Sequence, residues 1–219
     1  MRAILIVRLS AIGDIITASG LLPALRQAYP EARIDWLVQP ECGNLLDATY
    51  GLNAVLSLPQ KQWVRDIKRF KWASVAQEMT SLVRAVKQRD YDLVLDLQGL
   101  WKSAVPAWFT RASQRIGLDC REGSHRLMTD VVQSPQGDKR IASEYKALLE
   151  HLNIISDEYR LGIQVSDEDR SKALEIRTNH RVDRDYILFC PFTTRPQKHW
   201  MESSWSQLAQ QIGSELKMP

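Results

Sequence analysis

The sequence AILIVRLSAIGD, residues 3–14, is the most informative stretch of this chain about its fold. Its first five residues, Ala3–Val7, form an unbroken apolar run rich in β-branched side chains, which is typical of a strand covered on both faces in a parallel sheet. A short loop with one glycine follows, and from Ile15 apolar residues recur at helical spacing. A buried strand, a short loop and a helix are the beginning of a βαβ unit.

The same alternation continues through the first 155 residues. Further buried strands are predicted over Arg33–Gln39, Ala54–Leu58, Leu93–Leu97 and Arg115–Leu118. Helices are predicted between them: one that Pro23 kinks or delays, and others over Cys42–Ala48, Trp72–Arg89, Ser103–Phe109 and Ala142–Leu152. We therefore predict a doubly wound α/β domain over residues 1–155, with a Rossmann-like parallel sheet.

The pattern changes after residue 155. Residues 156–165 are expected to form a linker or crossing segment. Ser166 followed by three acids is a good helix start, Tyr186–Cys190 is predicted to be a buried strand, and Trp205–Leu216 a helix. One strand and two helices cannot bury both faces of a sheet. Residues 166–219 are therefore expected to begin a second Rossmann-like domain that is incomplete.

The composition excludes several classes of protein. The 219 residues are 44% hydrophobic and 25% charged with a net charge of +3, which is ordinary for a globular protein and implies neither disorder nor nucleic-acid binding. Cys42, Cys120 and Cys190 lie far apart without metal-ligand spacing, which favours a reducing cytosol over a disulfide framework. No apolar stretch is long enough to span a membrane, so any membrane contact is expected to be peripheral.

The loop after the first strand is the first candidate site, because ligands bind at the carboxyl ends of the strands in open α/β sheets. Gly13 lets the backbone approach a ligand, and Ser10 offers a hydroxyl beside the free amides of a helix N-terminus. A single glycine disfavours a dehydrogenase-type dinucleotide fold. Asp14 is either an ordinary acid of a first helical turn or a general base.

Three further segments carry candidate chemistry. Residues 61–72, KQWVRDIKRFKW, hold five cations against one acid with three aromatic side chains. They form a solvated face, a single-stranded nucleic-acid site or a site for an anionic lipid or sugar acid. DLQGLWKS, residues 96–103, follows a buried strand and is either a ligand-facing loop or a capped turn. FTTRPQKHW, residues 192–200, brings hydroxyls and cations together where a diphosphate can bind.

These motifs resemble those of the bacterial lipopolysaccharide heptosyltransferases. The resemblance lies in MRAILIVRLSAIGDI with LPAL at residues 22–25, in DLQGL followed by Lys-Ser, and in TTR followed by KHW, and it extends over residues 1–216. The closest likeness is to the heptosyltransferase I branch of the family. It implies a GT-B fold, in which the first domain holds the acceptor and the second holds the nucleotide sugar.

The resemblance also implies a reaction and a set of site residues. The reaction is inverting transfer of L-glycero-D-manno-heptose from ADP-heptose to a Kdo hydroxyl of Kdo-lipid A, with no cofactor and no metal. Asp14 is implied to be the catalytic base. The implied donor contacts are Ser10, Gly13, Thr193, Thr194 and Lys198, and the implied acceptor contacts are Lys61, Trp63, Arg65, Lys68, Arg69, Gln98 and Lys102. His199 is expected to be a packed or hydrogen-bonded side chain, and Asp167–Asp169 a helix start rather than a metal-binding pair.

The same resemblance implies a cytoplasmic enzyme in peripheral contact with the inner membrane of a Gram-negative bacterium and without a nucleic-acid partner. Two alternatives stay open. One is heptosyltransferase II or another member with a different acceptor, and the other is a non-catalytic module that binds anionic glycolipid. Because the remaining donor contacts of the family lie beyond residue 219, the 219-residue chain is expected to have little or no transferase activity by itself.

Overall fold

The computed structural model describes residues 1–138, 140, 142–155, 158–182, 185–191, 193 and 196–216. The chain divides into two compact units, Met1–Val165 and Ser166–Pro219, which we call unit 1 and unit 2. Unit 1 contains all of the strands that the structure describes. The candidate base Asp14 belongs to unit 1, and the candidate phosphate-binding residues Thr193 and Lys198 belong to unit 2.

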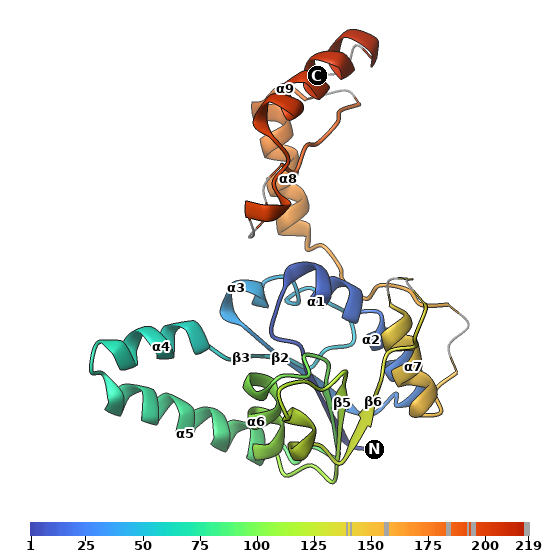
Figure 1. Ribbon diagram of the computed structural model, residues 1–219. Helices are drawn as coiled ribbons and strands as arrows, with labels where there is room; N and C mark the ends of the chain where they lie inside the picture. Colours follow the sequence, from blue (N-terminus) through green and yellow to red (C-terminus); the bar gives the residue numbers. More distant parts are fainter. Residues whose placement is uncertain are drawn as a thin grey trace. The chain divides into compact units, whose positions relative to one another are not determined.

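A parallel six-stranded sheet forms the centre of unit 1 (Figure 1). Its strands are β1 (Ala3–Val7), β2 (Arg33–Val38), β3 (Ala54–Ser57), β4 (Leu93–Asp96), β5 (Gln114–Leu118) and β6 (Asp130–Val132). The order across the sheet is β3-β2-β1-β4-β5-β6. The chain therefore adds β2 and β3 on one side of β1 and then β4, β5 and β6 on the other. This reversal between β1 and β4 is where open α/β sheets bind ligands.

The predicted α/β class is confirmed, and each predicted strand of unit 1 is found within one residue of its expected ends. β1 is buried along its whole length because it pairs on both sides, with Ile4 beside Ile34 of β2 and Leu93 of β4. β6 was not predicted, since its three residues are too few to show a periodic pattern.

One face of the sheet is covered by α1 (Ile12–Ala18), α2 (Leu21–Ala28) and α7 (Ser143–His151). Their apolar side chains pack on Ile4 and Ile6 of β1. The single helix expected after β1 is two helices, and Pro23 lies in the first turn of the second one. A proline is tolerated there because its missing N–H would have no partner within the helix. The short helix predicted over Cys42–Ala48 is α3 (Pro40–Gly43), with turns after it.

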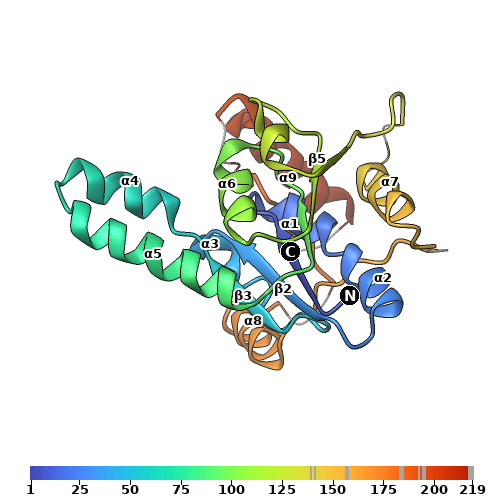
Figure 2. The same ribbon diagram turned by 90° about the horizontal axis from the view of Figure 1, so that it is seen from below.

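The other face is covered by α5 (Trp72–Gln88) and α6 (Trp101–Phe109), which pack on Leu5 and Val7 of β1. α4 (Gln60–Lys68) was not separated from its neighbours in the sequence, and it forms a hairpin with α5. Both views show this α4–α5 hairpin projecting away from the sheet (Figures 1 and 2). The chain then passes through a short 3-10 helix, η1 (Ser124–Leu127), before β6.

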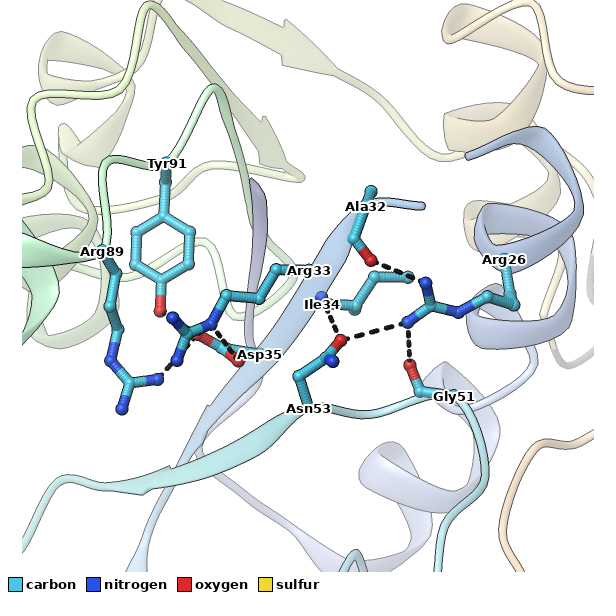
Figure 3. Close-up of polar contacts among 9 residues, drawn as sticks. All are labelled: Arg26, Ala32, Arg33, Ile34, Asp35, Gly51, Asn53, Arg89 and Tyr91. Atoms are coloured by element: carbon cyan, nitrogen blue, oxygen red, sulfur yellow. Dashed lines mark hydrogen bonds and ion pairs between the residues drawn. The ribbon is translucent and has the colours of Figure 1, made fainter. Parts of the chain in front are cut away.

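A buried carboxylate in β2 belongs to the framework of unit 1 (Figure 3). Asp35 is fully buried and is paired with Arg89 at 2.7 Å and with Arg33 at 2.9 Å. It also accepts a hydrogen bond of 2.6 Å from the Tyr91 hydroxyl. Burial, together with this bond, raises the pKa of Tyr91 well above its usual range, so the phenol stays protonated and keeps donating.

Figure 3 also shows Arg26 fixing the chain on either side of β2. Its guanidinium donates to the carbonyl oxygens of Ala32 at 2.6 Å and Gly51 at 2.6 Å, and to Asn53 Oδ1 at 3.2 Å. The same amide oxygen accepts the Ile34 N–H at 2.8 Å. The polar groups around β2 therefore satisfy one another and have a structural role.

Unit 2 contains α8 (Asp167–Asn179), a 3-10 helix η2 (Pro196–Lys198) and α9 (Glu202–Leu216). The predicted helix start is confirmed, because Ser166 Oγ accepts the Asp169 N–H at 3.0 Å. The predicted buried strand over Tyr186–Cys190 is wrong: these residues form no strand, and Leu188 is 76% exposed. The described part of unit 2 offers no second strand to pair with them, and an isolated strand leaves its backbone groups and both faces uncovered.

Candidate functional site

The candidate site lies at the carboxyl ends of β1 and β4. These strands are neighbours in register, with Val7 beside Asp96, and the Leu97 N–H donates to the Val7 carbonyl at 3.0 Å. The loops that leave the two strands therefore start side by side, although nearly 90 residues of chain separate them. Ser10 comes from the first loop and Asp14 from the first turn of α1 that follows it, whereas Gln98 comes from the second loop and Lys102 from the first turn of α6.

Asp14 is held at the N-terminus of α1 with its carboxylate half exposed, at 51% of its side-chain surface. Its Oδ2 accepts the Ala11 N–H at 3.0 Å and is paired with Arg8 Nη2 at 2.8 Å. The first contact is the capping role expected of an acid in a first helical turn. The second contact and the exposure leave a fixed carboxylate that a ligand at the edge of the sheet can reach.

Arg8, which the sequence did not single out, connects the two loops. Its side chain is only 13% exposed, and Nη1 donates to the Leu97 carbonyl while Nη2 pairs with Asp14. Its Nε is buried without a hydrogen-bond partner among the described residues. The one signal in the sequence is its position, because a cation directly after a buried strand lies where that strand meets a ligand.

Asp96, the last residue of β4, is a second carboxylate and is fully buried. Its oxygens accept the N–H groups of Gln98 at 3.0 Å and Gly99 at 3.2 Å, and the Ser103 hydroxyl at 3.0 Å. Burial raises the pKa of Asp96 to about 6, although these hydrogen bonds and the charge of Arg8 oppose the rise. Through these hydrogen bonds Asp96 fixes the loop after β4.

Gln98 was predicted to contact the acceptor, and the structure shows a contact with the protein itself. Its Oε1 accepts the N–H groups of Leu9 at 3.2 Å and Ser10 at 3.3 Å, so it braces the loop that carries Asp14. Gly99, next to it, has φ +64°, and a Cβ there would lie 2.4 Å from the Leu118 carbonyl oxygen. The glycine is required by this close approach of β5.

Ser10 and Gly13, the two donor-side predictions in unit 1, lie in the same loop and in the first turn of α1. Ser10 is half-buried, and its N–H is held by Gln98. Gly13 is exposed, and the space that a Cβ would occupy is open. Both residues lie within four sequence positions of Asp14.

The basic segment, residues 61–72, covers most of α4 and the turn that follows it. At the N-terminal end, Lys61 Nζ is paired with Glu41 at 3.1 Å and Trp63 Nε1 donates to Glu78 at 2.7 Å. Lys61, Arg65 and Lys68 are spaced by four and three residues, so they share one face of the helix. Lys68 is about 10 Å along the helix axis from Lys61, and Arg69 ends the helix at the turn of the hairpin.

Trp63 and Lys102 both line a cavity of about 370 Å³ between α4, α5 and α6. Gln60 Nε2, at the start of α4, donates to the Lys102 carbonyl at 2.9 Å and joins the two helix starts. The starts of α4 and α6, which carry Lys61 and Lys102, are thus joined, and α6 begins directly after the loop that leaves β4. Lys68 and Arg69 lie at the far end of the hairpin.

The candidate phosphate-binding loop belongs to unit 2. Lys198 is the last residue of η2, and Thr193 precedes that helix. His199 Nε2 lies 2.8 Å from the Thr193 carbonyl oxygen, so the expectation of a hydrogen-bonded histidine is confirmed. Thr194 lies outside the described residues.

Within the described part of the chain, no three His, Cys, Asp or Glu side chains lie close enough to bind a metal ion. Asp167–Asp169 form the first turn of α8, and Asp169 Oδ2 accepts the Ser166 hydroxyl at 2.6 Å, as expected for a helix start. No helix among the described residues is long and apolar enough to cross a membrane.

Several known proteins are similar to this chain. The lipopolysaccharide heptosyltransferase 1 of Salmonella typhimurium is 27% identical over 99% of this chain and 68% of its own length. A glycosyltransferase family 9 structure from Veillonella parvula superposes with a TM-score of 0.79 at 20% identity, over 99% of this chain and 61% of that one. The E. coli heptosyltransferase WaaC with ADP-2-deoxy-2-fluoro heptose gives a TM-score of 0.71 at 24% identity, over 96% of this chain and 65% of that one.

The chain thus spans about two thirds of the length of the curated relative, and the likeness to the solved structures confirms the predicted GT-B-type α/β fold. The sequence pattern of glycosyltransferase family 9 (heptosyltransferase) matches residues 79–215, which is more than half of the chain. The match includes the loop after β4 in unit 1 and the candidate phosphate-binding loop of unit 2. The chain therefore belongs to glycosyltransferase family 9, the heptosyltransferase family of transferase enzymes.

Proposed function

We propose that the protein transfers L-glycero-D-manno-heptose from ADP-heptose to a Kdo hydroxyl of Kdo-lipid A, with inversion and without a metal ion. The observation that carries this proposal is Asp14, a half-exposed carboxylate fixed by Arg8 at the switch point of the sheet. The names of the relatives support the substrates, because one is a lipopolysaccharide heptosyltransferase 1 and another was solved with a fluorinated ADP-heptose.

In this reaction Asp14 is the general base. It accepts the proton of the acceptor hydroxyl as the oxygen attacks the anomeric carbon of the heptose. The bond from that carbon to the diphosphate oxygen breaks in the same step, and its electron pair leaves with ADP. A single displacement of this kind inverts the configuration at the anomeric carbon.

The donor residues are proposed for each unit separately. Ser10 and Gly13 border the base, and Lys198 with the hydroxyls of Thr193 and Thr194 offsets the charge that develops on the departing diphosphate. Lys is suited to this role as a compact point charge. The exposed position of Lys198 at the end of η2 supports the assignment.

The acceptor side is assigned to the basic face of α4 and to the start of α6. Lys61 and Arg65 share a helix face, and Lys61 and Lys102 both lie in first helical turns near the sheet edge. Cations in this arrangement bind the carboxylates of Kdo and the phosphates of lipid A. Trp63 packs against the core of unit 1 and keeps its indole N–H on Glu78.

Peripheral contact with the cytoplasmic face of the inner membrane completes the proposal. The turn of the α4–α5 hairpin exposes Phe70 at 83% and Trp72 at 61% of their surfaces, and Lys68, Arg69 and Lys71 surround them. Basic residues with exposed aromatic side chains are suited to the surface of an anionic membrane.

The test replaces Asp14 by Asn in the full-length protein, with ADP release from ADP-heptose and Kdo-lipid A as the measurement. We expect kcat to fall by roughly 10²- to 10⁴-fold, the usual contribution of a general base, while calorimetry shows unchanged donor binding. Asp167→Asn is the matched control, since it makes the same change in the first turn of α8. Unchanged turnover by Asp14→Asn would contradict the proposed base.

The same assay separates the acceptor and the metal requirement. Preference for a core that already carries heptose, over Kdo-lipid A, would assign the acceptor of heptosyltransferase II instead. Loss of activity in excess EDTA would contradict the metal-free mechanism.

A further inference from the structure

The cavity between α4, α5 and α6 has a lining of which the proposed function uses only Trp63 and Lys102. We call it the α5–α6 groove; it is defined by Met79 and Val83 of α5, Trp101 and Val105 of α6, and Trp63 of α4. Ten of its twelve lining residues are apolar, and the two polar ones are Gln60 and Lys102. Such a lining favours an apolar ligand, because a polar ligand would lose its hydrogen bonds to water without finding new ones.

Both polar residues lie at one end of the groove. Gln60 begins α4 and Lys102 lies in the first turn of α6, and the hydrogen bond of 2.9 Å between the Gln60 amide and the Lys102 carbonyl joins these two helix starts. From there the lining follows α6 to its last residue, Phe109. The polar end therefore adjoins the candidate site, and the apolar part leads away from it.

We propose that the α5–α6 groove binds one acyl chain of the anionic glycolipid acceptor, with the ammonium group of Lys102 facing the charged head. The proposal rests on the proposed function in one respect, namely that this lipid is the acceptor. The ligand chemistry itself, an apolar tail with an anionic end, follows from the distribution of apolar and cationic residues in the groove.

The size of the groove limits the occupant to a single chain. Its volume of about 370 Å³ lies near the low end of the range for small-molecule pockets. Met79 and Trp101 are 45% and 40% exposed in its lining, and burying such side chains under an acyl chain is favourable. A peptide or a nucleotide would bring polar groups for which this lining has no partners.

The apolar surface of α5 continues beyond the groove. Trp72, Met79, Val83 and Val86 are spaced by seven, four and three residues and so lie along one stripe of the helix. The stripe leads from the groove to the exposed aromatic residues at the turn of the α4–α5 hairpin, where Lys68, Arg69 and Lys71 are their neighbours in the chain. The groove and the exposed Trp72 at the hairpin turn therefore lie along one face of α5, which an acyl chain can follow from a bilayer surface.

The experiment titrates the full-length protein with dodecyl phosphate below its micelle concentration and follows binding by calorimetry. Val105→Phe fills the groove, and we expect it to weaken binding more than about tenfold, since excluding two methylenes has this effect. Val165→Phe is the matched control, because Val165 is 54% exposed outside the groove. Equal affinity in Val105→Phe and the parent protein would overturn the proposal.

Two further measurements test the position of the ligand's charged head and the presence of an acyl chain in the groove. Lys102→Gln should weaken the binding of dodecyl phosphate more than the binding of dodecanol. An equal effect on both ligands would contradict the assigned position of the charge. Val83→Phe, on the facing helix, replaces Val105→Phe if circular dichroism shows that the latter does not fold. Inorganic phosphate should bind at least tenfold more weakly than dodecyl phosphate, and equal affinity would count against a chain-binding groove.

The assignment to the acceptor is tested by turnover. The ratio of KM for acylated acceptor to KM for deacylated acceptor should rise in Val105→Phe, and an unchanged ratio would exclude the acceptor as the occupant. If the parent protein turns over neither substrate, the proposed function fails. The dodecyl phosphate titration requires no turnover and still decides whether the groove binds a chain.

Discussion

Arg8 lies between two carboxylates of different character. Asp14 is half exposed and is paired with Arg8 at 2.8 Å, whereas Asp96 is fully buried and receives three hydrogen bonds. A buried carboxylate is costly unless its charge is compensated, and the charge of Arg8 contributes to that compensation. The same guanidinium therefore stabilises the end of β4 and fixes the candidate base.

Gln98 is expected to act as a positioning residue for the loop that carries Asp14. Replacing it by Ala removes the acceptor of the Leu9 and Ser10 N–H groups, which should lower the free energy of unfolding by about 1–2 kcal/mol. The kcat of the full-length protein should fall with it, and Gln98→Glu should restore both, because a carboxylate oxygen accepts the same bonds. Urea unfolding and ADP release are the measurements.

A different result would support the role predicted from the sequence. If Gln98→Ala raised only the KM for the acceptor and left the free energy of unfolding unchanged, Gln98 would be an acceptor contact. Gln60→Ala is a suitable control, since it too removes a half-buried amide that bonds to the backbone, here to the Lys102 carbonyl in the first turn of α6.

Asp96 predicts a pH dependence of stability. Because burial raises its pKa to about 6, above the value of about 4 in the unfolded chain, the folded state binds the extra proton between these pH values. The free energy of unfolding contributed by Asp96 is therefore highest below pH 4 and falls as the pH rises to 6. We therefore compare the free energy of unfolding of Asp96→Asn with that of the parent protein. From about pH 4 to pH 7.5 the difference should shift by about 2–3 kcal/mol in favour of the variant. Urea unfolding of both proteins at these two pH values measures the difference, and a constant difference would contradict the prediction.

Among the elements, the α4–α5 hairpin is the one that extends beyond the core of unit 1. Phe70→Asn with Trp72→Ser should reduce co-sedimentation with phosphatidylglycerol vesicles by about tenfold, because it removes the exposed aromatic pair. Asn is chosen because Phe70 has φ +59°, a conformation that Asn adopts readily, so the turn should persist.

The control for the hairpin is Trp108→Ser, which removes another exposed indole, 49% exposed, from the end of α6. It should leave vesicle association unchanged. Binding of the hairpin variant equal to that of the parent protein, or equal binding of the parent to neutral phosphatidylcholine vesicles, would contradict membrane contact through this turn.

At the scale of the whole molecule, the sheet and both of its covering layers lie within residues 1–165. We expect residues 1–165, expressed alone, to unfold in one cooperative transition, because the apolar side chains of β1 are buried by helices of this unit. Calorimetry and near-ultraviolet circular dichroism test this. A broad transition without near-ultraviolet signal would show that unit 1 depends on the residues that follow it.

The strands of unit 1 and the first turn of α8 could be predicted from local sequence alone. An apolar run such as AILIV, or Ser166 followed by three acids, specifies its structure through neighbours only a few residues away. The sequence also identified the loops that carry Asp14 and Lys198, since these follow apolar runs and match the motifs of a family. The error over Tyr186–Cys190 has the same origin, because local pattern indicates a strand but cannot supply its partner.

The tertiary structure was needed to show that Arg8 pairs with Asp14, that Gln98 faces Leu9 and Ser10, and that Trp63 and Lys102 line one cavity. The contacts between the β1 and β4 loops join residues nearly 90 positions apart. They exist because β4 returns to lie beside β1 in a specific register. Strand order and register depend on the packing of all the helices at once, so no periodicity within a short stretch of sequence encodes them.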